Sequence, residues 1–281
     1  MDNILEISNL SKSYDEFKLD NLSLQLPYGC IMGLIGENGA GKSTTIKLIL
    51  DLIHKDCGSI KVFGKNHELI TRLQKEEIGV VLDACHLPEK LNLIEIENVM
   101  KSMYTTWSKC DFDRYVNKFS LPKKTIIKDY SRGMKMKLSI AIALSHNPKL
   151  LILDEATSGL DPVVRDQILD VFWDFVQDEG NSILISSHIL SDLEKICDYI
   201  TFIHKGKLVF CDRKDLLAEK YGIARCGNDE LKCLDKNSII GYRKSQFSVE
   251  ALVTRENVPD TFSLEDASIE DIMLYHIRED V

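Results

Sequence analysis

Residues 30–49 read CIMGLIGENGAGKSTTIKLI, and this stretch decides the fold. The apolar run at 30–36 predicts a buried central strand, and the residues that follow Ser43 have the apolar spacing of a helix. Between them, residues 36–43 match G-x-x-x-x-G-K-[ST] in full, in the strand–loop–helix setting that a phosphate-binding loop requires. The stretch therefore predicts an α/β protein that binds a nucleoside triphosphate.

Each part of this loop has a chemical task. Its glycines let backbone N–H groups converge on phosphate oxygens, and the N-terminus of the following helix adds the positive end of its dipole. Lys42 can place a charge on the β and γ phosphates, and the hydroxyl of Ser43 suits Mg²⁺. The alternative is a glycine-rich turn that binds nothing. We expect nucleotide binding by Gly36, Glu37, Asn38, Gly39, Ala40, Gly41, Lys42, Ser43 and Thr44.

A second apolar run, at residues 150–153, ends in two adjacent carboxylates. A buried strand here would carry Asp154 to the edge of the sheet beside the phosphates, where it can hold Mg²⁺ through water. Glu155 lies one residue further and points differently, so it is placed to orient or deprotonate the attacking water. Without the phosphate loop, a strand ending in solvated carboxylates would explain the pair equally well.

The rest of the chain predicts an ordered series of regions. Residues 4–26 alternate apolar and polar side chains, which predicts half-buried strands of an N-terminal antiparallel β-subdomain. Residues 86–147 have helical spacing, and strands alternate with helices again after Pro148, which indicates a mostly parallel core sheet covered on both faces. We expect a main domain at 1–214 with an inserted helical subdomain at about 86–147. A small α+β accessory domain should follow at 215–281, closed by a helix within 263–280.

Composition and charge narrow the classes of partner. The chain has 281 residues, a net charge of −9 and a pI of about 5.3, which argues against nucleic acid as a partner. No apolar run approaches the ~20 residues that cross a bilayer, and the first ten residues lack the pattern of a secretory signal. We therefore expect a cytoplasmic chain, with any membrane role arising through a partner.

Further motifs make residues 4–215 resemble the ABC (ATP-binding cassette) ATPases. Residues 158–161, SGLD, resemble the D-loop that crosses the dimer seam, which assigns Asp161 to the nucleotide interface. His188 resembles the switch histidine that reaches the γ-phosphate, and Tyr14 resembles the aromatic side chain that stacks on adenine. The resemblance implies the P-loop ABC cassette fold, with ATP and Mg²⁺ as cofactors.

The signature motif of that family is represented by YSRGM at residues 130–134, in place of the familiar Leu-Ser-Gly-Gly-Gln. Ser131 and Gly133 are kept at the start of an expected helix. The resemblance implies that they grip the γ-phosphate of ATP bound to a facing copy, with Arg132 adding charge. In the alternative, Ser131 is only a helix cap.

A second departure is Asp83, which stands where most ABC cassettes carry a glutamine. A carboxylate can still ligate Mg²⁺ but cannot donate a hydrogen bond, so we expect Ser43, Asp83 and Asp154 as metal ligands. Both departures, with the Trp107 region and the C-terminal appendage, resemble the ATPases of bacterial ABC-2-type exporters. These include exporters of antimicrobial or toxin peptides, and the chain is similar to the ATPase subunits of phenol-soluble modulin exporters.

The resemblance implies a mechanism and partners. Two copies would close head to tail around two ATP molecules, with Lys42, Glu155 and His188 as catalytic residues. A separate transmembrane permease, contacted near residues 86–98, would hold the chain at the inner face of the cell membrane. Two alternatives are a soluble ABC ATPase that works on DNA or ribosomes, and a regulatory cassette that binds nucleotide with little turnover.

Overall fold

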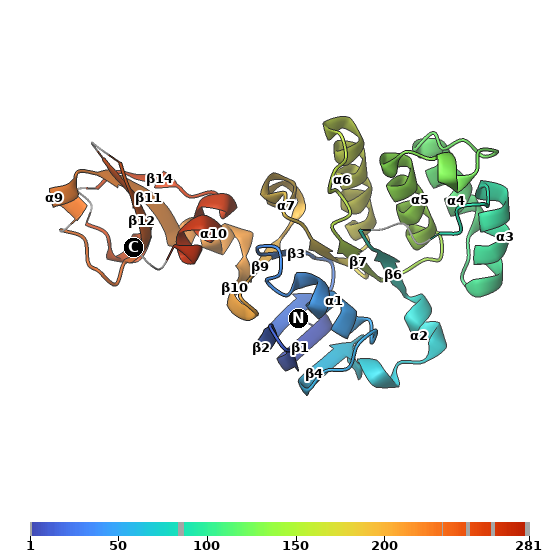
Figure 1. Cartoon of the computed structure of the whole chain (residues 1–281), viewed down its shortest axis with the longest axis horizontal. Helices are drawn as coiled ribbons and strands as arrows, with labels where there is room; N and C mark the ends of the chain where they lie inside the picture. The colour runs from blue at the N-terminus through green and yellow to red at the C-terminus, as the bar shows by residue number, and fades with distance from the viewer. Residues whose placement is uncertain (1, 84–86, 232, 246–247, 260–261, 279–281) are drawn as a thin grey trace.

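The structure is a computed structural model that describes residues 2–83, 87–231, 233–245, 248–259 and 262–278. Its described strands form three sheets, two of four strands and one of six. Figure 1 shows the six-stranded sheet at the centre, the N-terminal sheet beside it, a group of helices at one end of the molecule and a C-terminal module at the other. This is the mixed α/β architecture that the sequence predicts.

The central sheet has the strand order β10-β9-β3-β8-β7-β6. Its strands pair in parallel except for β10, which runs antiparallel to β9 at one edge. Leu34 of β3 and Asp154 of β7 both pair with Ser186 of β8, so these three strands end together. The strands are β3 (Ile31–Ile35), β6 (Ile78–Val81), β7 (Leu150–Asp154), β8 (Ser182–Ser186), β9 (Tyr199–His204) and β10 (Lys207–Arg213).

Two hydrophobic cores lie on opposite faces of this sheet. Along β7, Leu151 and Leu153 join the core that contains the helices after β6, whereas Leu150 and Ile152 join the core shared with the N-terminal sheet. All five residues of β7 are buried, which is usual for a parallel strand covered on both faces. Figure 1 shows α5, α6 and α7 on one face and α1 with β1 and β2 on the other.

The N-terminal sheet is antiparallel, in the order β2-β1-β4-β5. Alternate residues of β2 are buried from Leu22 to Leu26, which is the two-residue period that residues 4–26 predict. The helix after the phosphate loop, α1, packs into the same core through Ile46. The elements are β1 (Asn3–Ser13), β2 (Lys18–Pro27), α1 (Lys42–Ile49), β4 (Cys57–Val62) and β5 (Lys65–Asn66).

The inserted region is helical, as predicted, although residues 84–86 lie outside the described part of the chain. Asn92 and Glu95 form a capping box at the start of α3, and Ser108 caps α4. Thr105 donates two hydrogen bonds of 2.7 Å to Glu76, which ties the α3–α4 connection to the helix before β6. The helices of the inserted region are α3 (Leu93–Met103), α4 (Lys109–Lys118) and α5 (Arg132–Leu144), and the helix before β6 is α2 (Arg72–Glu76).

The C-terminal module has an antiparallel sheet in the order β12-β13-β11-β14 and a last helix, α10 (Ile269–Ile277). The predicted closing helix starts later than its pattern suggested, because Leu264–Asp266 pair with β11 as β14, and Ser268 then caps α10. The backbone N–H of Ile269 donates to Glu194 at 2.6 Å, so α10 lies against α7 (Leu190–Ile196). The remaining elements are α6 (Pro162–Val176), α8 (Lys214–Lys220), β11 (Tyr221–Cys226), α9 (Asn228–Leu231), β12 (Ile239–Lys244) and β13 (Val249–Thr254).

Among the described residues, no helix combines the length and apolar character that crossing a membrane requires.

Candidate nucleotide-binding site

The phosphate loop joins the end of β3 to the start of α1. At Gly36 a Cβ atom would lie 2.3 Å from the carbonyl oxygen of Ile203, so no side chain fits where this loop passes β9. Gly41 precedes α1 with φ of 119°, a conformation that L side chains rarely adopt. Glycine is therefore needed at both positions, at Gly36 because β9 passes so closely and at Gly41 because of its backbone conformation.

Lys42 occupies the centre of this loop. Its ammonium group donates hydrogen bonds to the carbonyl oxygens of Gly36 at 2.7 Å and Glu37 at 3.1 Å, and only 6% of the residue is exposed. Burial lowers the pKa of Lys42, and the nearby carboxylates of Glu155 and Asp154 oppose that shift. The loop thus holds a buried cation among backbone groups, which suits an anionic ligand.

Oxygen atoms from three segments meet at the end of β7. Asp154 Oδ1 accepts hydrogen bonds from Ser186 Oγ at 2.5 Å and from Ser43 Oγ at 3.4 Å. These are hard oxygen donors of the kind that Mg²⁺ uses with one or two carboxylates and substrate phosphates. The donor set therefore fits Mg²⁺. No cluster of three or more His, Cys, Asp or Glu side chains that could hold a metal occurs among the described residues.

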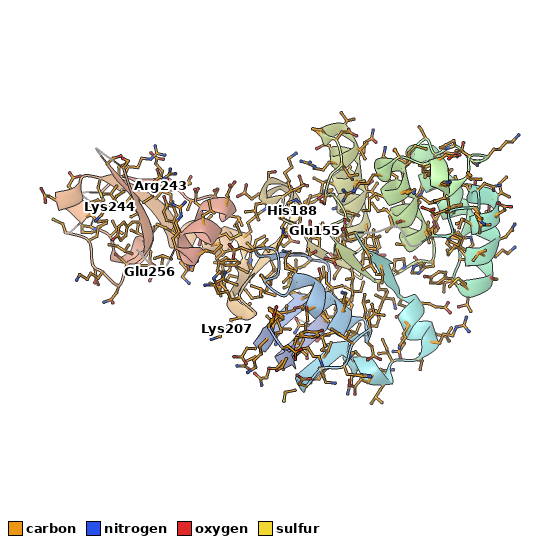
Figure 2. The ribbon with its side chains drawn as sticks, in the orientation of Figure 1. Glu155, His188, Lys207, Arg243, Lys244 and Glu256 are labelled. Carbon is orange, nitrogen blue, oxygen red and sulfur yellow. The ribbon has the colours of Figure 1, made fainter. Side chains whose placement is uncertain are left out.

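Glu155 and His188 form a close pair at the same edge of the sheet, as Figure 2 shows. The Nδ1 atom of His188 lies 2.5 Å from Glu155 Oε2, and the backbone N–H of Glu155 donates to Ser186 O at 3.1 Å. Glu155 has φ of 55°, which is uncommon for a residue with a side chain. The two carboxylates have different partners, Ser186 and Ser43 for Asp154 and His188 for Glu155, which agrees with the predicted difference in direction.

A cavity of about 980 Å³ brings most of the predicted residues together. The predicted residues that line it are Tyr14, Gly36, Glu37, Asn38, Gly39, Gly41, Lys42, Ser43, Thr44, Asp83, Arg132, Glu155 and His188. They come from the N-terminal sheet region, the phosphate loop, the segments that follow the central strands and, for Arg132, the start of α5. Residues far apart in the sequence therefore share one site.

Five other predicted residues do not line this cavity. Ala40 and Asp154 are buried behind it, at 4% and 9% exposure. Ser131 caps α5 by accepting from Met134 N at 3.2 Å, and Asp161 caps α6 in the same way. Gly133 lies in the first turn of α5. The capping role considered for Ser131 is therefore present in the structure.

The cavity also contains residues that sequence reasoning missed, namely Glu16, Phe17, Ser187, Leu190 and Met273, together with Ser158, which belongs to the motif that resembles the D-loop but was not assigned to the nucleotide. Phe17 lies beside Tyr14, with ring centroids 6.4 Å apart, and a Cβ on Gly41 would be 3.1 Å from its ring. A second aromatic residue three positions after Tyr14 was the available signal. Met273 comes from α10, and no local motif indicated that this helix reaches the cavity.

Asp83 and Arg132, the two positions at which the sequence departs from the family pattern, both line the cavity and contact each other. An Nη atom of Arg132 lies 3.0 Å from Asp83 Oδ1, and both side chains are more than half exposed. Asp83 is thus paired within its own chain.

The fold and the site together define a P-loop nucleotide-binding cassette. Residues 19–158 match the ABC transporter family model. The lantibiotic transport ATP-binding protein SrtF of Streptococcus pyogenes is 37% identical over 240 residues, which cover 84% of this chain and 98% of that protein. The bacitracin transport ATP-binding protein BcrA of Enterococcus faecalis is 35% identical over 212 residues, which cover 74% of this chain and 69% of that protein. This chain belongs to the ATP-binding proteins of the ABC transporter family.

Solved structures agree with this assignment. An ATP-binding subunit of an ABC transporter superposes with a TM-score of 0.67 at 28% identity, over 76% of this chain and 91% of that chain. The dimeric ATP-binding cassette MJ0796, in a post-hydrolysis state with ADP and Pi, superposes with a TM-score of 0.66 at 19% identity, over 74% of this chain and 98% of that chain. The second likeness shows the fold alone.

Proposed function

We propose that this chain hydrolyses ATP to drive a bacterial ABC-2-type exporter whose permease is a separate polypeptide. The observation that carries the proposal is the Glu155–His188 pair, 2.5 Å apart beside the phosphate loop. A carboxylate held by a histidine at the edge of a nucleotide cavity is suited to orient and deprotonate water. The cavity thereby combines a phosphate-binding loop with a base.

The other side chains divide the remaining tasks. Tyr14 stacks on adenine, and residues 36–44 hold the phosphates with the ammonium of Lys42 near the γ-phosphate. Ser43 and Asp154 hold Mg²⁺, with Asp83 as a further ligand when its carboxylate is free. The bound metal neutralises charge on the phosphate oxygens. His188 steadies the γ-phosphate and keeps Glu155 in position.

A second copy of the chain completes the site in this proposal. Ser131, Arg132 and Asp161 are exposed on their own chain, so they are free to meet a facing copy. Ser131 and Gly133 stand at the N-terminus of α5, where backbone N–H groups and the helix dipole favour a phosphate. Two copies in head-to-tail contact would each offer this terminus to the ATP of the other, with Asp161 at the seam.

The names of the relatives support export of peptides. SrtF and BcrA are transport ATP-binding proteins for a lantibiotic and for bacitracin. We infer that this chain lies in the cytoplasm on the inner face of the cell membrane and contacts its permease near residues 86–98, of which 87–98 are described. We propose that the cassette ends at residue 214 and that the accessory domain covers 215–281, since β10 ends at Arg213 and α8 starts at Lys214, next to this boundary.

Co-purification from membranes tests whether this chain binds a separate transmembrane permease. Tagged Glu155→Gln protein, with ATP, should retain a multi-spanning membrane protein from detergent-solubilised membranes of the native host. The same protein without ATP serves as the matched control, and Lys42→Met protein with ATP shows whether retention needs the nucleotide. Recovery of ribosomal or DNA-bound partners, with nothing from the membrane, would leave the ATP chemistry standing and contradict the transport role.

A further inference from the structure

The two positions at which this chain departs from the family pattern lie against each other. Asp83 follows β6 and Arg132 is the first residue of α5, and their side chains meet at 3.0 Å. Within the described residues, neither side chain has another ion-pair partner. The family has uncharged side chains at both positions, glutamine and glycine. Asp83 therefore adds a negative charge, and Arg132 adds a positive charge that forms an ion pair with it.

The guanidinium of Arg132 also touches the loop that follows Glu155. A Cβ atom on Gly159 would lie 2.6 Å from an Nη atom of Arg132, so the glycine leaves the space that the guanidinium fills. Gly159 has φ of 68°, which favours glycine independently. Arg132 thus contacts the segments after β6 and after β7 from the start of α5. All three segments adjoin the nucleotide cavity, which Asp83, Arg132 and Ser158 line.

A carboxylate oxygen that accepts from a guanidinium is less available to a metal ion. Mg²⁺ requires near-octahedral oxygen ligands, and Asp83 lines the same cavity as Ser43, whose hydroxyl donates to Asp154. A Mg²⁺ ion bound in this cavity would compete with the guanidinium for the carboxylate of Asp83. Because the pair is more than half exposed, it shifts an equilibrium by about fivefold at most, so incoming ligands can open it.

We propose that Arg132 is a positioning residue that controls access of Mg²⁺ to Asp83. In the chain without nucleotide, Arg132 holds Asp83 and keeps it from the metal. When a facing copy presents its ATP, Arg132 turns to that phosphate and releases Asp83 to the metal of its own site. The inference rests on the proposed function and deepens it, because it links the metal site of one copy to the nucleotide of the other. Because coupling between two binding sites is reciprocal, Mg²⁺ bound in one copy would change the affinity for ATP in the other by the same factor.

The test measures Mg²⁺ binding without turnover. Mg²⁺ is titrated by calorimetry into dilute, ATP-loaded Glu155→Gln protein at low salt, as the parent and with Asp83→Asn, Arg132→Gln or both. Arg132→Gln should lower the half-saturating Mg²⁺ concentration by about twofold to fivefold. In the Asp83→Asn background the same change should have no such effect, since the contested carboxylate is gone. The shift should shrink at ~0.5 M salt.

The control is Lys135→Gln, which removes the same charge from the same helix. Lys135 pairs with Glu89 at 3.3 Å, and neither residue lines the cavity. It should leave Mg²⁺ binding within the error of the parent. An Arg132→Gln shift that is equal in both backgrounds, or no larger than that of Lys135→Gln, would reflect general charge and overturn the inference.

A parent protein that binds no ATP would overturn the proposed function, and this inference with it. A parent that binds ATP while Arg132→Gln leaves Mg²⁺ binding unchanged overturns the inference alone. Arg132→Lys gives a further check, because it keeps the charge but loses the forked geometry. It should move the half-saturating Mg²⁺ concentration only part of the way to that of Arg132→Gln.

Discussion

The nucleotide site has a buried part and an exposed part, and these are built differently. In the buried part, Lys42 is 6% exposed and donates to backbone carbonyl oxygens of its own loop, and Asp154 is 9% exposed and accepts from Ser186 of β8. In the exposed part, Asp83 and Arg132 are more than half exposed and are held by each other. The first arrangement fixes side chains by packing, while the second leaves them free to exchange partners.

The buried part is supported by β3, β7 and β8, whose residues are buried throughout. Catalysis is helped by groups that need no reorganisation at the moment of reaction. The exposed Asp83–Arg132 pair is held by no such packing, and in the proposed function it is accessible to a second copy. Substitutions in the buried part should therefore have larger effects.

Glu155→Gln should have the largest effect. Removing the base from the Glu155–His188 pair should reduce the rate of phosphate release by about 10²–10⁴ while ATP still binds. A coupled assay for phosphate, with ATP affinity from calorimetry, measures both quantities. Hydrolysis at the parental rate would show that Glu155 is not the base.

Leu153→Ala tests the strand that supports Asp154. Leu153 is fully buried in β7, so the cavity left by this change should lower the free energy of unfolding by about 2–5 kcal/mol. The matched control is Leu73→Ala in α2, which is 62% exposed and should change it by about 0.5 kcal/mol or less. Urea unfolding followed by circular dichroism compares the two. Equal losses would contradict the view that β7 is a rigid support.

Lys42→Met tests the buried cation. Losing hydrogen bonds from a charged donor to the phosphates should weaken ATP binding by about 1.5–3 kcal/mol, which is roughly tenfold to a hundredfold. Lys47→Met is the control, because Lys47 is an exposed residue of the same helix. Calorimetric titration with ATP gives both affinities. Equal affinities would mean that Lys42 does not reach the phosphates.

Ser131→Ala should have the smallest effect on the isolated chain. Losing the cap of α5 should lower the free energy of unfolding by about 1 kcal/mol, as should Ser108→Ala at the cap of α4. The two variants should differ in ATP turnover, which only Ser131→Ala should reduce. If both variants keep the parental turnover, Ser131 is a helix cap alone.

The sequence predicted the buried strands and the phosphate loop better than it predicted contacts between residues that lie far apart in the chain. The phosphate loop and the apolar strand before Asp154 carry local patterns, and the central strands were placed to within a few residues. Tyr14, Lys42 and His188 were predicted to belong to one site, and the structure brings them to one cavity. A local sequence pattern is enough to predict a feature that a single continuous segment forms, such as the phosphate loop.

Three features depend on tertiary contacts that no local pattern contains. Met273 reaches the cavity because α10 packs on α7, nearly 80 residues earlier in the sequence. The pairing of Asp83 with Arg132 joins two motifs that were considered separately. Residues 264–266 were predicted to lie within the closing helix, but they pair with the edge of β11 as a strand. Each required knowledge of which elements become neighbours.

The central claim is that this chain hydrolyses ATP at a site completed by a second copy. The most direct measurement is Mg²⁺-dependent phosphate release per chain over a wide range of protein concentration, with EDTA as the blank. The account predicts no release in EDTA and, with Mg²⁺, a turnover per chain that rises with concentration until the dimer saturates. A turnover per chain that is constant across the range, or absent at every concentration, would contradict it.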